Sequence, residues 1–274
     1  MISEYYDRTS RKLIWLGGVM TALTAVFTGW HLFTSFAHFR FNGGMELFVY
    51  GWVVGPGLLI TGIVKKKLAV KKLQKPPVTD ADRDLFSARR TMILTHMHWL
   101  REYEIYAMDG TRLIHVKEKG GRGHKAASFV LQLVGVRSFL KKRLVVENNG
   151  DIIFYIEKER GINAPYYLLD RNRNTAASYK MNLLNPMKQF AVIRDGSGNV
   201  IGENDGKFSG IHFKVRNKEG EQLIELFHQG IPSEAINMFG WSNGDMLVTN
   251  QSRLSEDTRP AFILAPVIVK LHFS

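Results

Sequence analysis

The chain has 274 residues, with 37 Lys and Arg against 25 Asp and Glu, and it contains no cysteine. Its 45% hydrophobic and 23% charged fractions exclude a disordered or collagen-like chain. The lack of cysteine excludes a disulfide framework, a thiolate-ligated zinc site, an iron–sulfur cluster and a thiol nucleophile. The formal net charge of +12 raises nucleic acid and anionic membrane surfaces as partners.

The basic excess lies mainly in the first quarter of the chain. Residues 1–75 carry ten Lys and Arg against three acidic residues, which is more than half of the net charge. A nucleic-acid-binding protein would instead concentrate basic residues on its folded domain. We therefore expect no nucleic-acid partner.

Two runs without charged residues follow one another in this N-terminal segment, at residues 13–39 and 47–64. A helix rises ~1.5 Å per residue, so the second run is long enough for a bilayer core and the first can cross with a tilt. A short polar turn, Arg40 to Glu46, separates them. This pattern predicts a transmembrane helical hairpin in residues 1–75, with spans at about 13–38 and 46–64.

Basic residues flank the predicted hairpin on both outer sides, whereas the turn between the spans has one Arg and one Glu. By the positive-inside rule, both termini and everything after residue 75 are expected on the cytoplasmic side of the cell membrane. The flank after the second span is either a plain stop-transfer signal or also a patch for anionic lipid, where each basic residue contributes ~1 kcal/mol. Its lysines are Lys65, Lys66, Lys67, Lys71 and Lys72.

Small and polar residues follow one face of the first span, and the second span contains a GxxxG pattern. We interpret them as a seam between the two helices, or between hairpins of different protomers, so a homo-oligomer through the hairpin is expected. His31 is either an ionisable site or a neutral, hydrogen-bonded imidazole. We favour the neutral form, because neither span carries a carboxylate. The seam comprises Gly17, Thr21, Thr24, Thr28, His31, Ser35, Gly51 and Gly55.

Residues 76–94 are predicted as a linker with two prolines and a short helix. From residue 95 onward, short runs rich in Ile, Val, Tyr and Phe alternate with turns containing Gly, Asn or Asp, as is typical of β-hairpins. Four hairpins look alike, at residues 106–114, 146–154, 192–203 and 214–225, and a fifth at 166–181 is looser. So many hairpins predict an antiparallel barrel in residues 95–274, because a sheet that large must manage its edges.

Two apolar segments interrupt the hairpins. Ala126 to Leu140 is either buried strand or an interfacial amphipathic segment that touches the bilayer; we favour the strand, because its apolar residues cover more than one helical face. Ala261 to Val269 is wholly apolar, is too short to span a membrane, and follows residues that suit a helix start. We expect this second segment to be a helix in the barrel core.

Hairpins of the form VIRDGSGNVIGE, residues 192–203, followed by an apolar helix resemble the tubby-like superfamily. That superfamily includes the tubby C-terminal domain, the LURP-one-related proteins and the phospholipid scramblases. The resemblance covers roughly residues 95–274 and implies about twelve antiparallel strands around a C-terminal hydrophobic helix. With the N-terminal hairpin, the chain looks like a bacterial membrane-anchored member. The expected fold is an α+β membrane protein, with a transmembrane hairpin and a tubby-like barrel.

The resemblance also implies phosphoinositide binding through basic side chains on the barrel. It does not map residue by residue onto this chain, so candidates are chosen by chemistry alone, and the alternative for each is solvated surface charge. Scramblases are linked to calcium, but no stretch here matches the twelve-residue calcium loop. The lipid-binding candidates on the barrel are Lys117, Lys119, Arg122, Lys125, Arg137, Lys141, Lys142 and Arg143.

The sequence holds no GxSxG, P-loop, HExxH or dinucleotide-binding motif. His96 and His98 share one face of a predicted strand, but no third metal ligand can be assigned. We therefore predict no catalytic residues, no metal and no cofactor. The predicted function is a membrane-anchored cytoplasmic binding or sensor module that contacts anionic phospholipid or a protein partner at the inner leaflet. The alternative is scramblase-like or transport activity through assembled hairpins, which the polar stripe favours.

Overall fold

The computed structural model of the chain divides into two compact units, residues 1–76 and 77–274, which are described separately. The description covers residues 1–34, 45–73, 85–96, 100–133, 139–182, 188–207, 212–228, 231, 233–240, 242 and 244–273.

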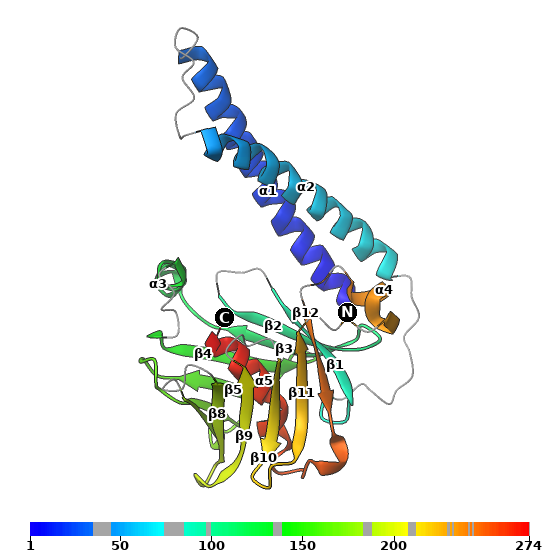
Figure 1. The fold of residues 1–274 in the computed structure, drawn as a ribbon, viewed down its shortest axis with the longest axis vertical. Helices are drawn as coiled ribbons and strands as arrows, with labels where there is room; N and C mark the ends of the chain where they lie inside the picture. The colour runs from blue at the N-terminus through cyan, green and yellow to red at the C-terminus, as the bar shows by residue number, and fades with distance from the viewer. Residues whose placement is uncertain are drawn as a thin grey trace. The chain divides into compact units, whose positions relative to one another are not determined.

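The first unit consists of two long helices, α1 (Ile2–Thr34) and α2 (Met45–Leu73), which pack side by side (Figure 1). Among the described residues, α1 alone is both long and apolar enough to cross a membrane. It begins well before the predicted first span, and residues 35–38 of that span lie outside the described residues. The predicted second span and the cytoplasmic orientation stay predictions.

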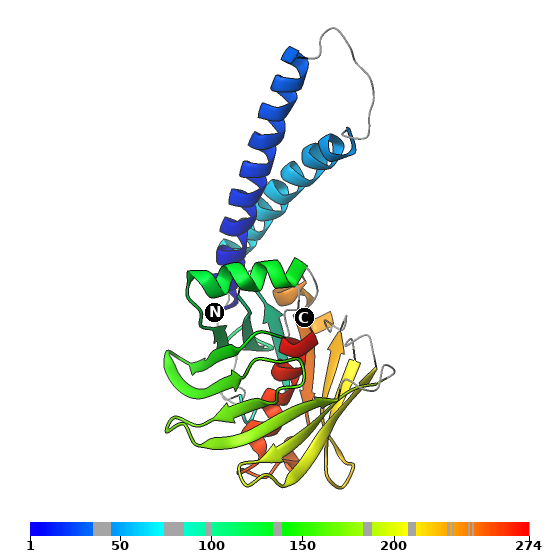
Figure 2. The ribbon, with the colours of Figure 1, turned by 90° about the vertical axis from the view of Figure 1, so that its left-hand side faces the viewer.

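The second unit is a closed antiparallel barrel, as predicted, in which each strand pairs with its neighbours in sequence and the first pairs with the last (Figure 2). The described residues form twelve strands: β1 (Arg90–Thr95), β2 (Glu102–Ala107), β3 (Arg112–Glu118), β4 (Lys142–Asn148), β5 (Asp151–Lys158), β6 (Tyr166–Leu169), β7 (Thr175–Asn182), β8 (Lys188–Asp195), β9 (Val200–Lys207), β10 (His212–Asn217), β11 (Gln222–His228) and β12 (Gly244–Thr249).

One turn geometry closes four of the hairpins, at residues 107–111, 170–174, 195–199 and 217–221. The first and fifth residues are joined by a backbone hydrogen bond, and the fourth residue has a positive φ. Glycine adopts this φ without steric cost in three of these turns, whereas Arg173 adopts it at φ 69°. The hairpin at 166–181, predicted to be looser, therefore shares the common turn. The hairpin at 146–154 differs, because its two turn residues both have positive φ.

Helix α5 (Arg259–Phe273) lies inside the barrel (Figures 1 and 2). All side chains from residue 261 to residue 269 are buried, and the Tyr179 hydroxyl of β7 donates to the carbonyl of Ala261 at 2.6 Å. Lys270, beyond the apolar run, pairs with the buried Asp245 of β12, and burial lowers the pKa of Lys270 to about 8. This agrees with the core helix expected from the sequence.

Three elements differ from the expectations. Strand β1 begins at Arg90, so the barrel starts before residue 95, and residues 85–87 form a turn where the short helix was expected. The rest of that predicted helix, and the linker, fall at residues 74–84, outside the description. Residues 122–133 form helix α3 (Arg122–Leu133), so the favoured strand interpretation of this segment was wrong. The remaining helices are α4 (Ser233–Phe239) and the short 3-10 helix η3 (Gln251–Arg253).

Candidate functional site

Basic residues gather at one end of the barrel. Because neighbouring strands are antiparallel, β3 ends, β4 begins and β5 ends at the same place, and α3 lies there between β3 and β4 (Figures 1 and 2). We call this the α3 end. Its residues 117–125, 141–143 and 158–160 include nine basic residues against two carboxylates.

Carboxylates predominate at the opposite end, which we call the turn end. The tight turns between strands and the segment before α5 hold eight acidic residues against four basic ones, and the segment that enters β1 at this end adds the exposed Arg89 and Arg90. The barrel is therefore electrically polarised along its axis. These stretches are residues 108–111, 149–151, 170–174, 195–199, 217–221 and 251–258.

Four of the predicted lipid-binding residues are exposed together at the α3 end. Lys117 and Lys119 lie at the end of β3, Lys125 on α3, and Arg143 on β4. The backbone N–H of Lys119 donates to the carbonyl of Arg143 at 2.8 Å, so these two residues lie on adjoining strands. We call these four residues the basic patch.

Lys141 and Glu159 lie beside the basic patch, next to the loop after β5. The Lys141 ammonium donates to the Glu159 carboxylate at 2.6 Å. That hydrogen bond lowers the pKa of Glu159, and the charges of Lys141, Arg143 and Arg160 add to the effect. Arg160, exposed and missed by the sequence analysis, therefore belongs to the same electropositive region. The sequence signal was its position two residues beyond β5, next to Glu159, the partner of Lys141.

Lys142 is not a surface residue, and its prediction as a lipid ligand was wrong. Its side chain is 1% exposed, and its ammonium donates to the carbonyl of Leu271 at 2.8 Å. Alternate residues of β4 point into the barrel, and Lys142 shares this inward face with Leu144 and Val146. There it satisfies a carbonyl in the last turn of α5, where a cation also complements the helix dipole.

A second buried lysine lies beside it. Lys158 of β5 pairs in register with Lys142, is fully buried, and donates to the carbonyls of Glu159 and Gly161. Burial and the charges of both lysines lower the pKa of His272 to about 4. The two lysines and His272 are therefore part of the barrel's interior, not of its outer surface.

A side-chain hydrogen bond joins α3 to the barrel. His124 of α3 lies 3.1 Å from the buried carboxylate of Glu118, at the end of β3. Glu118 also accepts the backbone N–H of Arg101 at 2.8 Å. The side chain of Arg122 and all of Arg137 lie outside the described parts of the chain.

The predicted lysine flank of the first unit lies on the last turns of α2. Lys66, Lys67 and Lys71 are exposed, whereas the ammonium of Lys65 lies 6.0 Å and 5.9 Å from the ring centroids of Tyr5 and Tyr6 of α1. The side chain of Lys72 is not among those described. Three of the five lysines are thus free to face an anionic surface.

The predicted seam residues lie where α1 and α2 meet. A Cβ on Gly17 would be 2.8 Å from the Gly55 carbonyl, and one on Gly55 would be 2.6 Å from the Thr21 hydroxyl. Gly51 approaches Thr24 in the same way. Thr28 makes a polar contact, because the Trp52 indole donates to its hydroxyl at 3.1 Å. The side chain of His31 and all of Ser35 lie outside the description.

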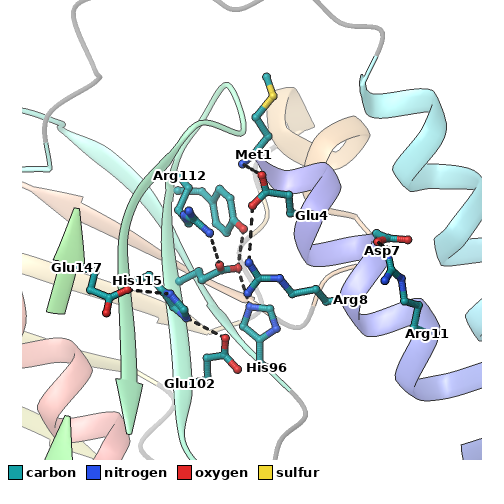
Figure 3. Close-up of polar contacts among 12 residues, drawn as sticks. Met1, Glu4, Asp7, Arg8, Arg11, His96, Glu102, Arg112, His115 and Glu147 are labelled. Atoms are coloured by element: carbon teal, nitrogen blue, oxygen red, sulfur yellow. Dashed lines mark hydrogen bonds and ion pairs between the residues drawn. The ribbon is translucent and has the colours of Figure 1, made fainter. Parts of the chain in front are cut away.

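His96 is part of a polar cluster on the outer face of β1 and β2. Its Nε2 lies 2.6 Å from the carboxylate of Glu104, which also accepts from Tyr106 at 2.7 Å and Arg112 at 3.1 Å (Figure 3). Burial alone would raise the pKa of Glu104, but hydrogen bonds from His96, Tyr106 and Arg112 lower it below its usual range. The described residues contain no group of three or more ligands fit for a metal. His98 is not described.

A neighbouring histidine also pairs with carboxylates. His115 of β3 lies 2.8 Å from Glu102 and 3.8 Å from Glu147 (Figure 3). In both clusters a histidine side chain lies within hydrogen-bonding distance of a carboxylate on a neighbouring strand. These side-chain contacts therefore join neighbouring strands on the outer face of the barrel.

A groove of about 260 Å³ lies at the turn end, between the β10–β11 turn and the start of α5. Its two cations already have partners: Lys218 lies 3.7 Å from Glu219, and Arg253 lies 3.4 Å from Glu221. The α3 end, where five of the described cations are exposed, is therefore the better candidate for an anionic partner.

Comparison of the chain with models of known protein families and with curated protein sequences finds no match to either.

Proposed function

We propose that the chain is a membrane-anchored module whose barrel contacts anionic phospholipid through the basic patch. The charge polarity of the barrel carries this proposal. A polarised barrel beside an anionic leaflet is oriented with its α3 end towards the lipid and its turn end away, since each exposed basic residue contributes about 1 kcal/mol near such a surface.

We further propose that both helices of the first unit cross the cell membrane and that the barrel is cytoplasmic. Large apolar side chains are exposed along both helices, which in water would leave an extensive apolar surface uncovered. The lysines that follow on α2 fit a cytoplasmic flank. The exposed apolar residues include Trp15, Leu23, Val26, Phe27, Trp30 and Phe33 on α1, and Val49, Tyr50, Val53, Ile60 and Ile63 on α2.

The tubby-like superfamily remains our proposed relationship for the barrel. A closed barrel with an apolar helix at its centre, following all the strands in the chain, supports it. The proposal concerns architecture and extends to lipid as the class of ligand, because the basic patch is the surface that would receive it.

The helix seam bears on the alternative of scrambling or transport. Polar residues that faced lipid would favour a path for headgroups, but Thr21, Thr24 and Thr28 face glycines or an indole of α2. Their hydroxyls also donate to carbonyls one turn earlier in α1. This arrangement favours a packed anchor, so the binding module is our preferred function.

Vesicle co-sedimentation of the barrel fragment, residues 77–274, tests the proposal once its far-UV spectrum shows β structure. Vesicles of phosphatidylcholine are compared with vesicles that also contain phosphatidylglycerol, at low and moderate salt. We expect binding to the anionic vesicles alone, weakening as salt screens the charges. The double variant Lys119→Glu/Arg143→Glu loses about 2 kcal/mol of attraction, roughly thirtyfold in affinity, before any repulsion is counted.

A matched control reverses two cations at the turn end, Arg171→Glu/Lys218→Glu, with the same change in net charge. This variant should bind nearly as well as the unmodified fragment. Equal losses in the two variants would show that net charge, rather than the basic patch, governs binding. Absence of salt-sensitive binding would overturn the proposal in favour of a protein partner.

A further inference from the structure

Two large apolar side chains are exposed beside the basic patch. Phe139, just before β4, is 49% exposed, and Ile162, just after β5, is 45% exposed. The backbone N–H of Gly161 donates to the carbonyl of Phe139 at 3.0 Å, which joins the two segments. Phe139 and Ile162 are therefore neighbours at the α3 end, and we call them the apolar pair.

The loop that bears Ile162 is held from inside the barrel. The buried Lys158 ammonium donates to the carbonyls of Glu159 and Gly161, which precede Ile162 in the loop. The N–H of Ala164 bonds back to Gly161 at 3.4 Å. Because the loop is already ordered, little conformational entropy is lost when a partner buries Ile162.

Cations lie close to the apolar pair along the chain. Lys141 and Arg143 follow Phe139 in the chain, Arg160 precedes Ile162, and all three act on Glu159 between them. Apolar side chains with cations at their rim match the interface of an anionic bilayer, where apolar groups enter the acyl boundary and cations stay at the phosphate level. Helix α1 of the same chain is long and apolar enough to cross a membrane.

We propose that Phe139 and Ile162 insert into the headgroup–acyl boundary of an anionic bilayer and anchor the α3 end there. The inference rests on the proposed function for the identity of the partner. It adds that burial of apolar side chains, as well as charge attraction, stabilises the contact with the bilayer. It therefore predicts contact that persists in part when salt screens the basic patch.

Because the chain has no cysteine, single reporters can be placed in the full-length protein without background labelling. Phe139→Cys, Ile162→Cys and Val200→Cys are labelled with an environment-sensitive NBD probe and placed in nanodiscs of phosphatidylcholine, with or without phosphatidylglycerol. Val200 is the matched control, because it is also 45% exposed but begins β9 at the turn end. Doxyl-labelled lipid then reports contact with the acyl region.

We expect blue-shifted emission at positions 139 and 162 in anionic nanodiscs, and doxyl quenching to about half of the unquenched intensity, with little change at position 200. Quenching at 139 and 162 no greater than at 200 would overturn insertion, even if the barrel fragment still sediments with anionic vesicles. Quenching that is equally strong in neutral nanodiscs would support insertion while overturning the anionic part of the proposed function.

Discussion

Substitution of Lys142 tests whether its ammonium stabilises the barrel from the inside. Its sequence neighbour Lys141 provides the control, because it is the same residue type but points to the surface. Lys142 is buried and bonded to the Leu271 carbonyl, whereas Lys141 is half-buried and paired with Glu159 at the surface. We compare Lys142→Met with Lys141→Met, since methionine keeps the length of the aliphatic stem and removes the charge.

The expected losses follow from these contacts. A buried charged hydrogen bond contributes about 1.5–3 kcal/mol, and a cation at a helix C-terminus adds up to about 2 kcal/mol. Methionine relieves the cost of burying an ammonium, which offsets part of that sum. We expect a net loss of about 2 kcal/mol for Lys142→Met. For Lys141→Met we expect about 0–1 kcal/mol, because surface ion pairs contribute little.

Urea unfolding of the full-length protein in detergent, followed by the β signal in circular dichroism, measures both variants. Equal stability losses would refute the assignment of Lys142 to the interior. So would a drop in anionic-lipid binding for Lys142→Met without a loss of stability, since that result describes a surface ligand. A second readout is the pKa of His272, which should rise when the charge of Lys142 is removed.

Two further predictions concern pH and the helix seam. The pKa of His272 is lowered to about 4 in the folded barrel, below its unfolded value of about 6.5. As the pH falls, the unfolded chain therefore takes up the proton first, and the free energy of unfolding decreases as the pH falls from about 6.5 to about 4. Urea unfolding across this range should show a slope that His272→Gln reduces; an unchanged slope would assign the effect elsewhere. In the seam, Gly17→Val should weaken the α1–α2 contact by about 1–3 kcal/mol, because its Cβ would lie 2.8 Å from the Gly55 carbonyl. Gly18→Val, with no atom within 4 Å, should be tolerated, and thermal melts of helical ellipticity that drop equally for both variants would contradict the seam.

The barrel could be predicted because its signals are local. The turn from Asp195 to Asn199 contains a glycine at the one position that needs positive φ, and the turn from Asn217 to Glu221 repeats it. The apolar run of α5 likewise predicts a buried helix without knowledge of the residues that surround it. These features depend on neighbours within a few residues, and the structure reproduces them.

The misjudged features depend on tertiary surroundings. The run Lys141–Arg143 holds three cations in succession, so charge alone does not say which of them faces inward; alternation with Leu144 and Val146 carries that signal. Glu104 could not be found as a buried group, because its partners His96 and Arg112 come from two other segments. Helix α3 was misjudged because an apolar run of that length fits a strand or a helix equally well.

The position of α5 in the chain determines when the barrel core can form during synthesis. The helix that fills the barrel follows all twelve described strands, so during synthesis every inward-facing apolar side chain emerges before the element that covers it. Closure between β1 and β12 is likewise a contact between distant parts of the chain. The apolar inner face of the nascent barrel therefore stays exposed until α5 has left the ribosome. We expect folding in cells to depend on chaperones that prevent such exposed sheets from aggregating.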